Sequence, residues 1–157
     1  MVLRLRISTP KDGDRVMEIW RTAVDATHDF LSVKDRQEIE RELVDFLPSA
    51  PLWLAVDRND TAIGFMLLNG SHMDALFVHS DKHGSGVGRM LVEHAIRHAP
   101  ALTTTVNEQN TRAFGFYRRM GFQPVGRSAT DDQGRPYPLI HLRYAHRAIG
   151  VQSNSDL

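Results

Sequence analysis

The chain has 157 residues, 41% of them hydrophobic and 24% charged, and its 19 basic and 19 acidic residues cancel. This composition is typical of one soluble globular domain, and the balanced charge gives no global field that would attract nucleic acid or anionic lipid. The absence of cysteine excludes disulfides, thiolate metal sites and a cysteine that carries a group covalently. No apolar run approaches the length of a membrane span or of a signal-peptide core, so we expect a cytoplasmic protein without a membrane partner.

Hydrophobic periodicity, capping residues and turn residues predict the secondary structure. In chain order, the expected elements are a strand at 3–8, a helix that Thr9 and Pro10 open, a helix from the cap Ser32 to about Leu47, strands at 52–56, 63–69 and 72–78, a helix from about Val87 that ends before Pro100, a strand at 102–106, a helix from the cap Asn110 to about Met120 that Gly121 closes, and strands at 123–129 and 139–144. This order predicts one α/β (α+β) domain with a mixed, mostly antiparallel sheet rather than a regular βαβ repeat. Residues 146–157 are expected to form a frayed tail.

The same periodicity assigns apolar side chains to the core. The expected inward residues are Leu3, Leu5 and Ile7 of the first strand, Val16, Ile19, Trp20 and Val24 of the first helix, and Ile39, Leu43, Phe46 and Leu47 of the second.

A glycine-rich loop follows the expected strand 72–78 and runs directly into a helical pattern. Gly84, Gly86 and Gly88 allow positive φ angles and a close approach of the backbone to a ligand. The free N–H groups of such a loop and of the helix start form a cradle for an anion, usually a phosphate. The sequence therefore predicts a phosphorylated cofactor.

Two common classes of phosphate binder fit this loop poorly. A P-loop needs Lys followed by Ser or Thr after the last glycine, whereas Arg89 and Met90 stand there. A dinucleotide fingerprint needs a third glycine where Arg89 stands, and a second mononucleotide-binding half is missing, although Glu108 falls near the distance of a ribose-binding acid. A dinucleotide enzyme remains a weaker reading.

A second motif identifies the loop more specifically. Residues 110–122 have the form N-x-x-A-x-x-F-Y-x-x-x-G-F, and residues 76–88 have the form L-x-V, five residues, then G-x-G-x-G. Together and in this order, the two motifs resemble the GNAT superfamily of N-acetyltransferases, over about residues 3–145. Residues 24–31 and 132–139 resemble a bacterial subgroup of small acetyltransferases. The resemblance implies a single GNAT-like domain with about seven strands and about four helices.

The resemblance also implies acetyl-coenzyme A as co-substrate. In the family, the strand backbone at Leu76 to Val78 holds the pantetheine arm, the loop amides hold the pyrophosphate, Asn110 matches a residue on the arm, and Tyr117 matches one near the thioester sulfur. His83 departs from the family pattern, which has Arg or Gln at the start of the loop. The implied cofactor-binding residues are Leu76, Phe77, Val78, His83, Gly84, Ser85, Gly86, Val87, Gly88, Arg89, Asn110 and Tyr117.

Acetyl transfer to a primary amine needs a base for the ammonium, a donor for the developing oxyanion and a proton for the thiolate. A backbone N–H near Leu76 or Phe77 is the family-like oxyanion donor. Tyr117 is the candidate acid. An ordinary phenol has a pKa of about 10 and a thiol one of about 8.5, so full proton transfer is uphill by about 2 kcal/mol. Tyr117 acts either as a hydrogen-bond donor or, if the site lowers its pKa, as a true acid.

His72 is the candidate base, because it precedes Val78 by six residues, where some family members carry a catalytic Glu. A histidine accepts a proton near neutral pH, directly or through water. Asp74, on the same expected strand, is expected to orient His72 or to bind a cationic substrate. Asp25 and His28 are expected to line the acceptor side, since the region between the first two helices shapes specificity in the family.

The histidines give no metal signal. His94 and His98 are spaced i, i+4 on one helix, but no acidic partner such as that of His-Glu-x-x-His accompanies them. We therefore expect a metal-free acetyltransferase that acts by direct transfer in a ternary complex on a primary amine of a small molecule or peptide. The alternative is a non-catalytic acyl-coenzyme A binding or sensing domain, against which the intact Asn110 and Tyr117 argue. Homodimers are common in the family, and the sequence leaves both the acceptor and the oligomeric state open.

Overall fold

The structure is a computed structural model that describes residues 2–145; residue 1 and residues 146–157, where the frayed tail is expected, lie outside the described part. Its helices and strands are β1 (Arg4–Ile7), α1 (Gly13–Thr27), α2 (Val33–Phe46), β2 (Trp53–Val56), β3 (Ala62–Asn69), β4 (His72–Val78), α3 (Val87–His98), β5 (Thr103–Asn107), α4 (Thr111–Met120), β6 (Phe122–Ser128) and β7 (Leu139–Tyr144). Short 3-10 turns cover Pro10–Asp12, Leu47–Ser49 and Ser80–Lys82. In the described residues, no helix is both long enough and apolar enough to cross a bilayer.

The strands form a mixed sheet in the order β1-β2-β3-β4-β5-β7-β6. β4 and β5 pair in parallel through His72 and Met73, whereas the pairs β1–β2, β2–β3, β5–β7 and β6–β7 are antiparallel. The expectation of a mixed, mostly antiparallel sheet of seven strands with four helices is confirmed. The described residues divide into two compact units: unit 1 comprises residues 2–68 and 74–93, and unit 2 comprises residues 69–73 and 94–145.

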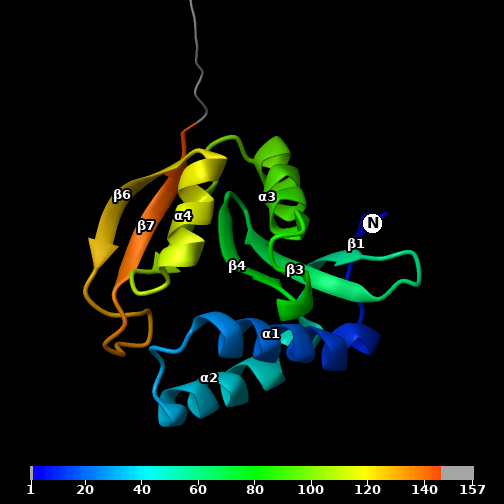
Figure 1. The fold of residues 1–157 in the computed structure, drawn as a ribbon, viewed down its shortest axis with the longest axis horizontal. Coiled ribbons are helices and arrows are strands. Elements are labelled where there is room, and N and C mark those ends of the chain that lie inside the picture. The colour runs from blue at the N-terminus through cyan, green and yellow to red at the C-terminus, as the bar shows by residue number, and fades with distance from the viewer. Residues whose placement is uncertain (1, 146–157) are drawn as a thin grey trace, which may run out of the picture. The chain divides into compact units, whose positions relative to one another are not determined.

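Unit 1 has its core between α1 and the faces of β2 and β3. The apolar residues expected on one side of α1 are all buried there, together with Leu52, Leu54 and Phe65. α2 lies alongside α1 (Figure 1), and its cap is as expected, since the Ser32 hydroxyl accepts a hydrogen bond from Asp35 N.

Two core expectations in unit 1 are wrong. Phe46 is 51% exposed, because the chain tightens into the 3-10 turn at Leu47 and that residue takes the inward position at the end of α2. Ile7 is 44% exposed, because it ends the edge strand β1. On this strand it is Arg6 that is half-buried, held by hydrogen bonds to Asp12 and Asp60.

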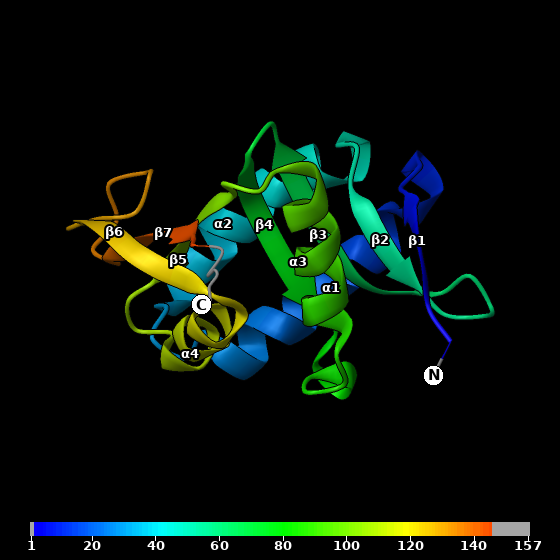
Figure 2. The same ribbon diagram turned by 90° about the horizontal axis from the view of Figure 1, so that it is seen from above.

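Unit 2 is built on β5, β7 and β6, with α4 packed against β5 and β6 (Figures 1 and 2). Both expected ends of α4 are confirmed. Asn110 Oδ1 accepts a hydrogen bond from Ala113 N at 3.1 Å, and Gly121 ends the helix with a φ of 109°, in the left-handed region that favours glycine. Phe122 then packs edge-on against Tyr117, with ring centroids 5.3 Å apart, and fixes the face of α4 that carries this tyrosine.

Candidate active site

The glycine loop leaves open space where a ligand could approach its backbone. Gly84 and Gly86 have φ angles of 78° and 93°, and no other part of the protein lies within 4 Å of where a Cβ would stand on either residue. Gly88, which the sequence placed in the loop, lies inside α3. Two glycines rather than three therefore supply the loop's unusual conformation.

The start of α3 supplies backbone donors next to this space. The bond from Met90 N to the Gly86 carbonyl, at 3.0 Å, is the first of the helical pattern, so the N–H groups of Val87, Gly88 and Arg89 have no acceptor within the helix. These three groups also lie at the positive end of the helix dipole. The arrangement suits an anion such as a pyrophosphate.

Two side chains expected on the cofactor have partners within the protein. The hydroxyl and the amide N–H of Ser85 both donate to the Lys82 carbonyl and close the turn before the helix. The Arg89 guanidinium lies 3.2 Å from Glu93, one turn along α3. Contact of either side chain with a phosphate remains a prediction.

His83 supports the loop in a way that the family pattern did not indicate. Its Nε2 lies 2.8 Å from the carbonyl oxygen of Val78, so the ring donates a hydrogen bond to the last residue of β4. A second histidine, His79, directly follows β4 and is buried. Its Nδ1 accepts a hydrogen bond from Asp81 N at 3.2 Å. Sequence reasoning missed His79, because a histidine at a strand end carries no signal of its own. Both rings tie the loop to the end of β4.

Gly64 on β3 is a second residue that sequence reasoning missed. A Cβ at this position would lie 2.9 Å from Val87 Cγ1 and 3.2 Å from the Phe77 carbonyl oxygen. The missing side chain therefore lets the first turn of α3 pack directly on β3 and fixes the position of its N-terminal amides. An isolated glycine inside a strand pattern was the available signal.

The β4 residues expected along the pantetheine arm are half-buried. Leu76, Phe77 and Val78 lie at the C-terminal end of the strand, and the Phe77 ring packs against Phe65 at a centroid distance of 5.5 Å. The Val78 carbonyl already accepts the hydrogen bond from His83. The arm contacts themselves remain a prediction.

Tyr117 is buried in unit 2. Burial raises the pKa of this phenol well above its ordinary value. The sequence left open whether the site lowers the pKa of Tyr117; it does the opposite. Asn110 is also buried, and its cap bond uses the side-chain oxygen, so its amide nitrogen is the group suited to a ligand contact.

His72 lies at the start of β4, with Nδ1 2.7 Å from Thr103 Oγ1. When the Thr103 hydroxyl donates to the Ser71 carbonyl, 3.4 Å away, Nδ1 carries the ring hydrogen and Nε2 is the nitrogen that accepts a proton. This arrangement is compatible with the predicted base.

The residues expected on the acceptor side have structural partners. Asp25 accepts two hydrogen bonds from Arg36, at 2.6 and 3.1 Å, which join α1 to α2. His28 ends α1 with Nδ1 2.7 Å from the Thr27 hydroxyl, and Asp74 lies exposed on β4. Contact of these residues with an acceptor remains a prediction.

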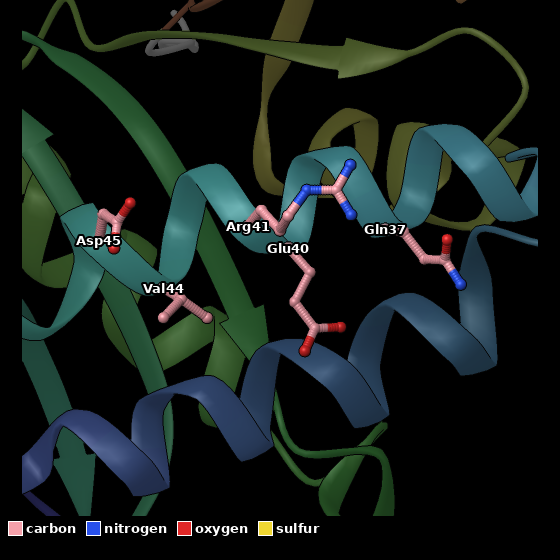
Figure 3. A pocket seen from close by; sticks show the side chains of 5 residues that line it. All are labelled: Gln37, Glu40, Arg41, Val44 and Asp45. Carbon is pink, nitrogen blue, oxygen red and sulfur yellow. The ribbon is translucent and has the colours of Figure 1, made fainter.

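A hollow of about 450 Å³ lies on one face of α2 (Figure 3). The five residues that line it all belong to this helix: Gln37, Glu40, Arg41, Val44 and Asp45. None of them was expected to bind a ligand, and Glu40 already accepts hydrogen bonds from Arg21 and Arg36, which lower the pKa of its carboxyl. The part of the chain that the structure describes contains no group of three or more metal-binding side chains.

Comparison with known proteins agrees with the motifs. A family model described as an acetyltransferase (GNAT) domain matches residues 20–137. The chain is 57% identical over 144 residues to a Salmonella typhimurium protein named peptidyl-lysine N-acetyltransferase YjaB, covering 92% of this chain and 99% of that protein. The Escherichia coli protein of the same name is 56% identical over 144 residues, with 92% and 98% covered.

Solved structures show the same fold. The solution structure of apo-form YjaB from Escherichia coli superimposes with a TM-score of 0.90 at 54% identity and covers 96% of this chain and 100% of that one. The PaiA N-acetyltransferase from Thermoplasma acidophilum, solved in complex with coenzyme A, reaches a TM-score of 0.73 at 18% identity, with 92% and 100% covered, which is a likeness of fold alone. These matches confirm the resemblance and the fold predicted from the sequence.

Proposed function

Because the chain belongs to the GNAT acetyltransferase family, we propose that it transfers the acetyl group of acetyl-coenzyme A to the side-chain amine of a lysine in a peptide or protein. The observation that carries the lysine acceptor is the identity of more than half over nearly the whole length of two relatives named peptidyl-lysine N-acetyltransferases. Acetyl-coenzyme A as donor also fits the cytoplasmic location expected from the sequence.

The loop fits the pyrophosphate of coenzyme A by its own geometry. Open space lies beside Gly84 and Gly86, and the amides of residues 87–89 have no acceptor within the helix. Acetyl-coenzyme A supplies the activated acyl group when it is bound. We assign its phosphates to these amides, with His83 holding the loop against β4.

We assign the two proton transfers of the reaction to His72 and Tyr117. His72 Nε2 takes the proton from the lysine ammonium, directly or through water, so that the neutral amine can attack the thioester carbonyl. Tyr117 donates its hydroxyl hydrogen toward the departing sulfur. Because the chain has no cysteine, the acetyl group passes directly to the amine and not through a cysteine acyl-enzyme.

A thiol-release assay tests the proposal. A lysine-containing peptide should release free coenzyme A and gain one acetyl group by mass spectrometry, whereas the matched peptide with arginine in place of lysine should do neither. Tyr117→Phe should lower kcat with little change in KM for acetyl-coenzyme A, and His72→Gln should remove the acidic limb of the pH–rate profile. An unchanged acidic limb would exclude His72 as the base.

Binding experiments separate the alternatives. If coenzyme A raises the melting temperature but no amine in a panel of peptides, polyamines and amino acids releases thiol, the protein is an acyl-coenzyme A sensor and the proposal is wrong. A thermal shift with NAD(P) and none with coenzyme A would favour the dinucleotide reading instead.

A further inference from the structure

The sheet of unit 2 has one face that points away from α4. The helix packs on the side that carries Phe122, whose ring meets Tyr117 of α4 (Figure 1). Successive side chains of a strand point to opposite faces, and directly opposite residues of neighbouring strands share a face. Gln123, which follows Phe122, and its partner Arg143 on β7 therefore lie on the face away from α4.

The strand register places His72 on this same face. Thr103 of β5 pairs with His72 on one side and with Arg143 on the other, and its hydroxyl lies 2.7 Å from the His72 ring. The three residues thus form one row across β4, β5 and β7. Because neighbouring strands are about 4.8 Å apart, the backbones at His72 and Arg143 are separated by about 10 Å.

The neighbours of Arg143 on this face are neutral polar groups. Thr105 lies directly opposite His141, which is two residues before Arg143 on β7, and His141 Nε2 is 2.6 Å from the Ser128 hydroxyl of β6. The strands β5, β6 and β7 contain no aspartate or glutamate. This part of the face therefore offers hydrogen bonds but no carboxylate to neutralise a cation.

Arg143 is an exposed cation, and no ion pair joins it to any carboxylate among residues 2–145. Unit 2 has seven arginines, no lysine and three acidic residues. Two of those acids already have partners, since Glu108 pairs with Arg127 and Asp131 with Arg135. The excess positive charge of unit 2 makes Arg143 a complement for an anionic group of a ligand.

We propose that Arg143 selects acceptors in which an aspartate or glutamate side chain lies within three residues of the acetylated lysine. The inference rests on the proposed function, in which the lysine ammonium gives its proton to His72. Three residues of an extended peptide span about 10 Å, which equals the separation of His72 and Arg143 across the sheet. A guanidinium binds a carboxylate with two parallel hydrogen bonds, so it distinguishes glutamate from glutamine.

Matched peptides test this preference in the thiol-release assay with the full chain. Each peptide has blocked ends and one lysine, with glutamate or glutamine at one position from three residues before the lysine to three after it. At the preferred position, kcat/KM should be about three- to tenfold higher for glutamate, because a charge-assisted hydrogen bond forms at an exposed site. The ratio should shrink as salt is raised, since salt screens exposed charges.

Three variants assign the preference to one side chain. Arg143→Gln should bring the ratio to about one through a higher KM for the glutamate peptide, and Arg143→Glu should reverse it in favour of glutamine. Arg119→Gln is the matched control, since Arg119 is also an exposed arginine of unit 2 but belongs to α4, and it should keep the ratio. Circular dichroism checks that each variant is folded, and Arg143→Met replaces a glutamine variant that does not fold.

Several outcomes would overturn the proposal. These are equal use of glutamate and glutamine peptides at all six positions, a preference for lysine or arginine beside the acceptor, a glutamate preference that survives Arg143→Gln, and one that Arg119→Gln removes as well. Failure of the unmodified protein to acetylate any lysine peptide would instead overturn the proposed function.

Discussion

Gly86→Ala is the most direct test of the anion cradle. Gly86 has a φ of 93°, and an added Cβ would meet no other part of the protein within 4 Å. The substitution therefore creates no clash and acts on the backbone alone. An L-residue with a side chain is disfavoured in this region by about 1–2 kcal/mol, and the exposed loop can relieve that strain by turning its peptide groups.

The expected effect on binding follows from those peptide groups. A hydrogen bond to a charged group is worth about 1.5–3 kcal/mol, so misplacing one loop amide should raise KM for acetyl-coenzyme A by about ten- to hundredfold. kcat should change by less than about threefold, because the pyrophosphate contact is the same in the ground state and the transition state.

Gly70→Ala is the matched control. Gly70 also has a positive φ, 62°, with nothing within 4 Å of its added Cβ, but it lies in the turn between β3 and β4. Initial rates of thiol release and urea unfolding should be measured on both variants. Both should lose stability, whereas only Gly86→Ala should raise KM. Equal KM values in the two variants would refute the assignment of the loop to the pyrophosphate.

Three further substitutions probe the surroundings of the loop and the N-terminal strand. Gly64→Ala should cost about 1–3 kcal/mol of stability and raise KM for acetyl-coenzyme A, because the new Cβ would lie 2.9 Å from a methyl of Val87 and displace the start of α3; a normal melting temperature would contradict this. His83→Ala should raise KM by about three- to tenfold and His83→Gln should restore part of it, measured by the same assay, because only glutamine can still donate to Val78 O. Asp12→Asn should cost about 1–2 kcal/mol in urea unfolding at pH 7, because hydrogen bonds from Arg6 hold the pKa of Asp12 at about 2, below its ordinary 3.8; the difference from the unmodified protein should persist above pH 4 and shrink as the pH falls toward 2.

Elements with strong local signals could be predicted from the sequence. The strand boundaries agree with the structure to within one residue, because alternation and turn residues define them locally. The caps Ser32 and Asn110 and the closing Gly121 are likewise decided by neighbours three or four residues away. Phe46 is an exception: it is the last residue of α2 and is exposed, although the helical period places it beside Leu43 and Leu47.

The candidate site was predicted less completely, because its supporting contacts join residues on different elements. The close approach of Gly64 to Val87 depends on how α3 packs on β3. The pairing of Asp25 with Arg36 depends on how α2 lies against α1. Composition and spacing along the chain carry no information on these contacts.

Burial of Tyr117 decides between the two roles that the sequence left open for it. Since burial raises the pKa of the phenol, its ionised form is even less accessible than in water, and a free thiolate cannot take its proton at equilibrium. If Tyr117 is the acid, as proposed, it must therefore donate its proton while the C–S bond breaks and negative charge first develops on sulfur. The raised pKa also keeps Tyr117 protonated in the neutral range, so an acidic limb in the pH–rate profile is expected from the proposed base or the acceptor amine and not from this residue.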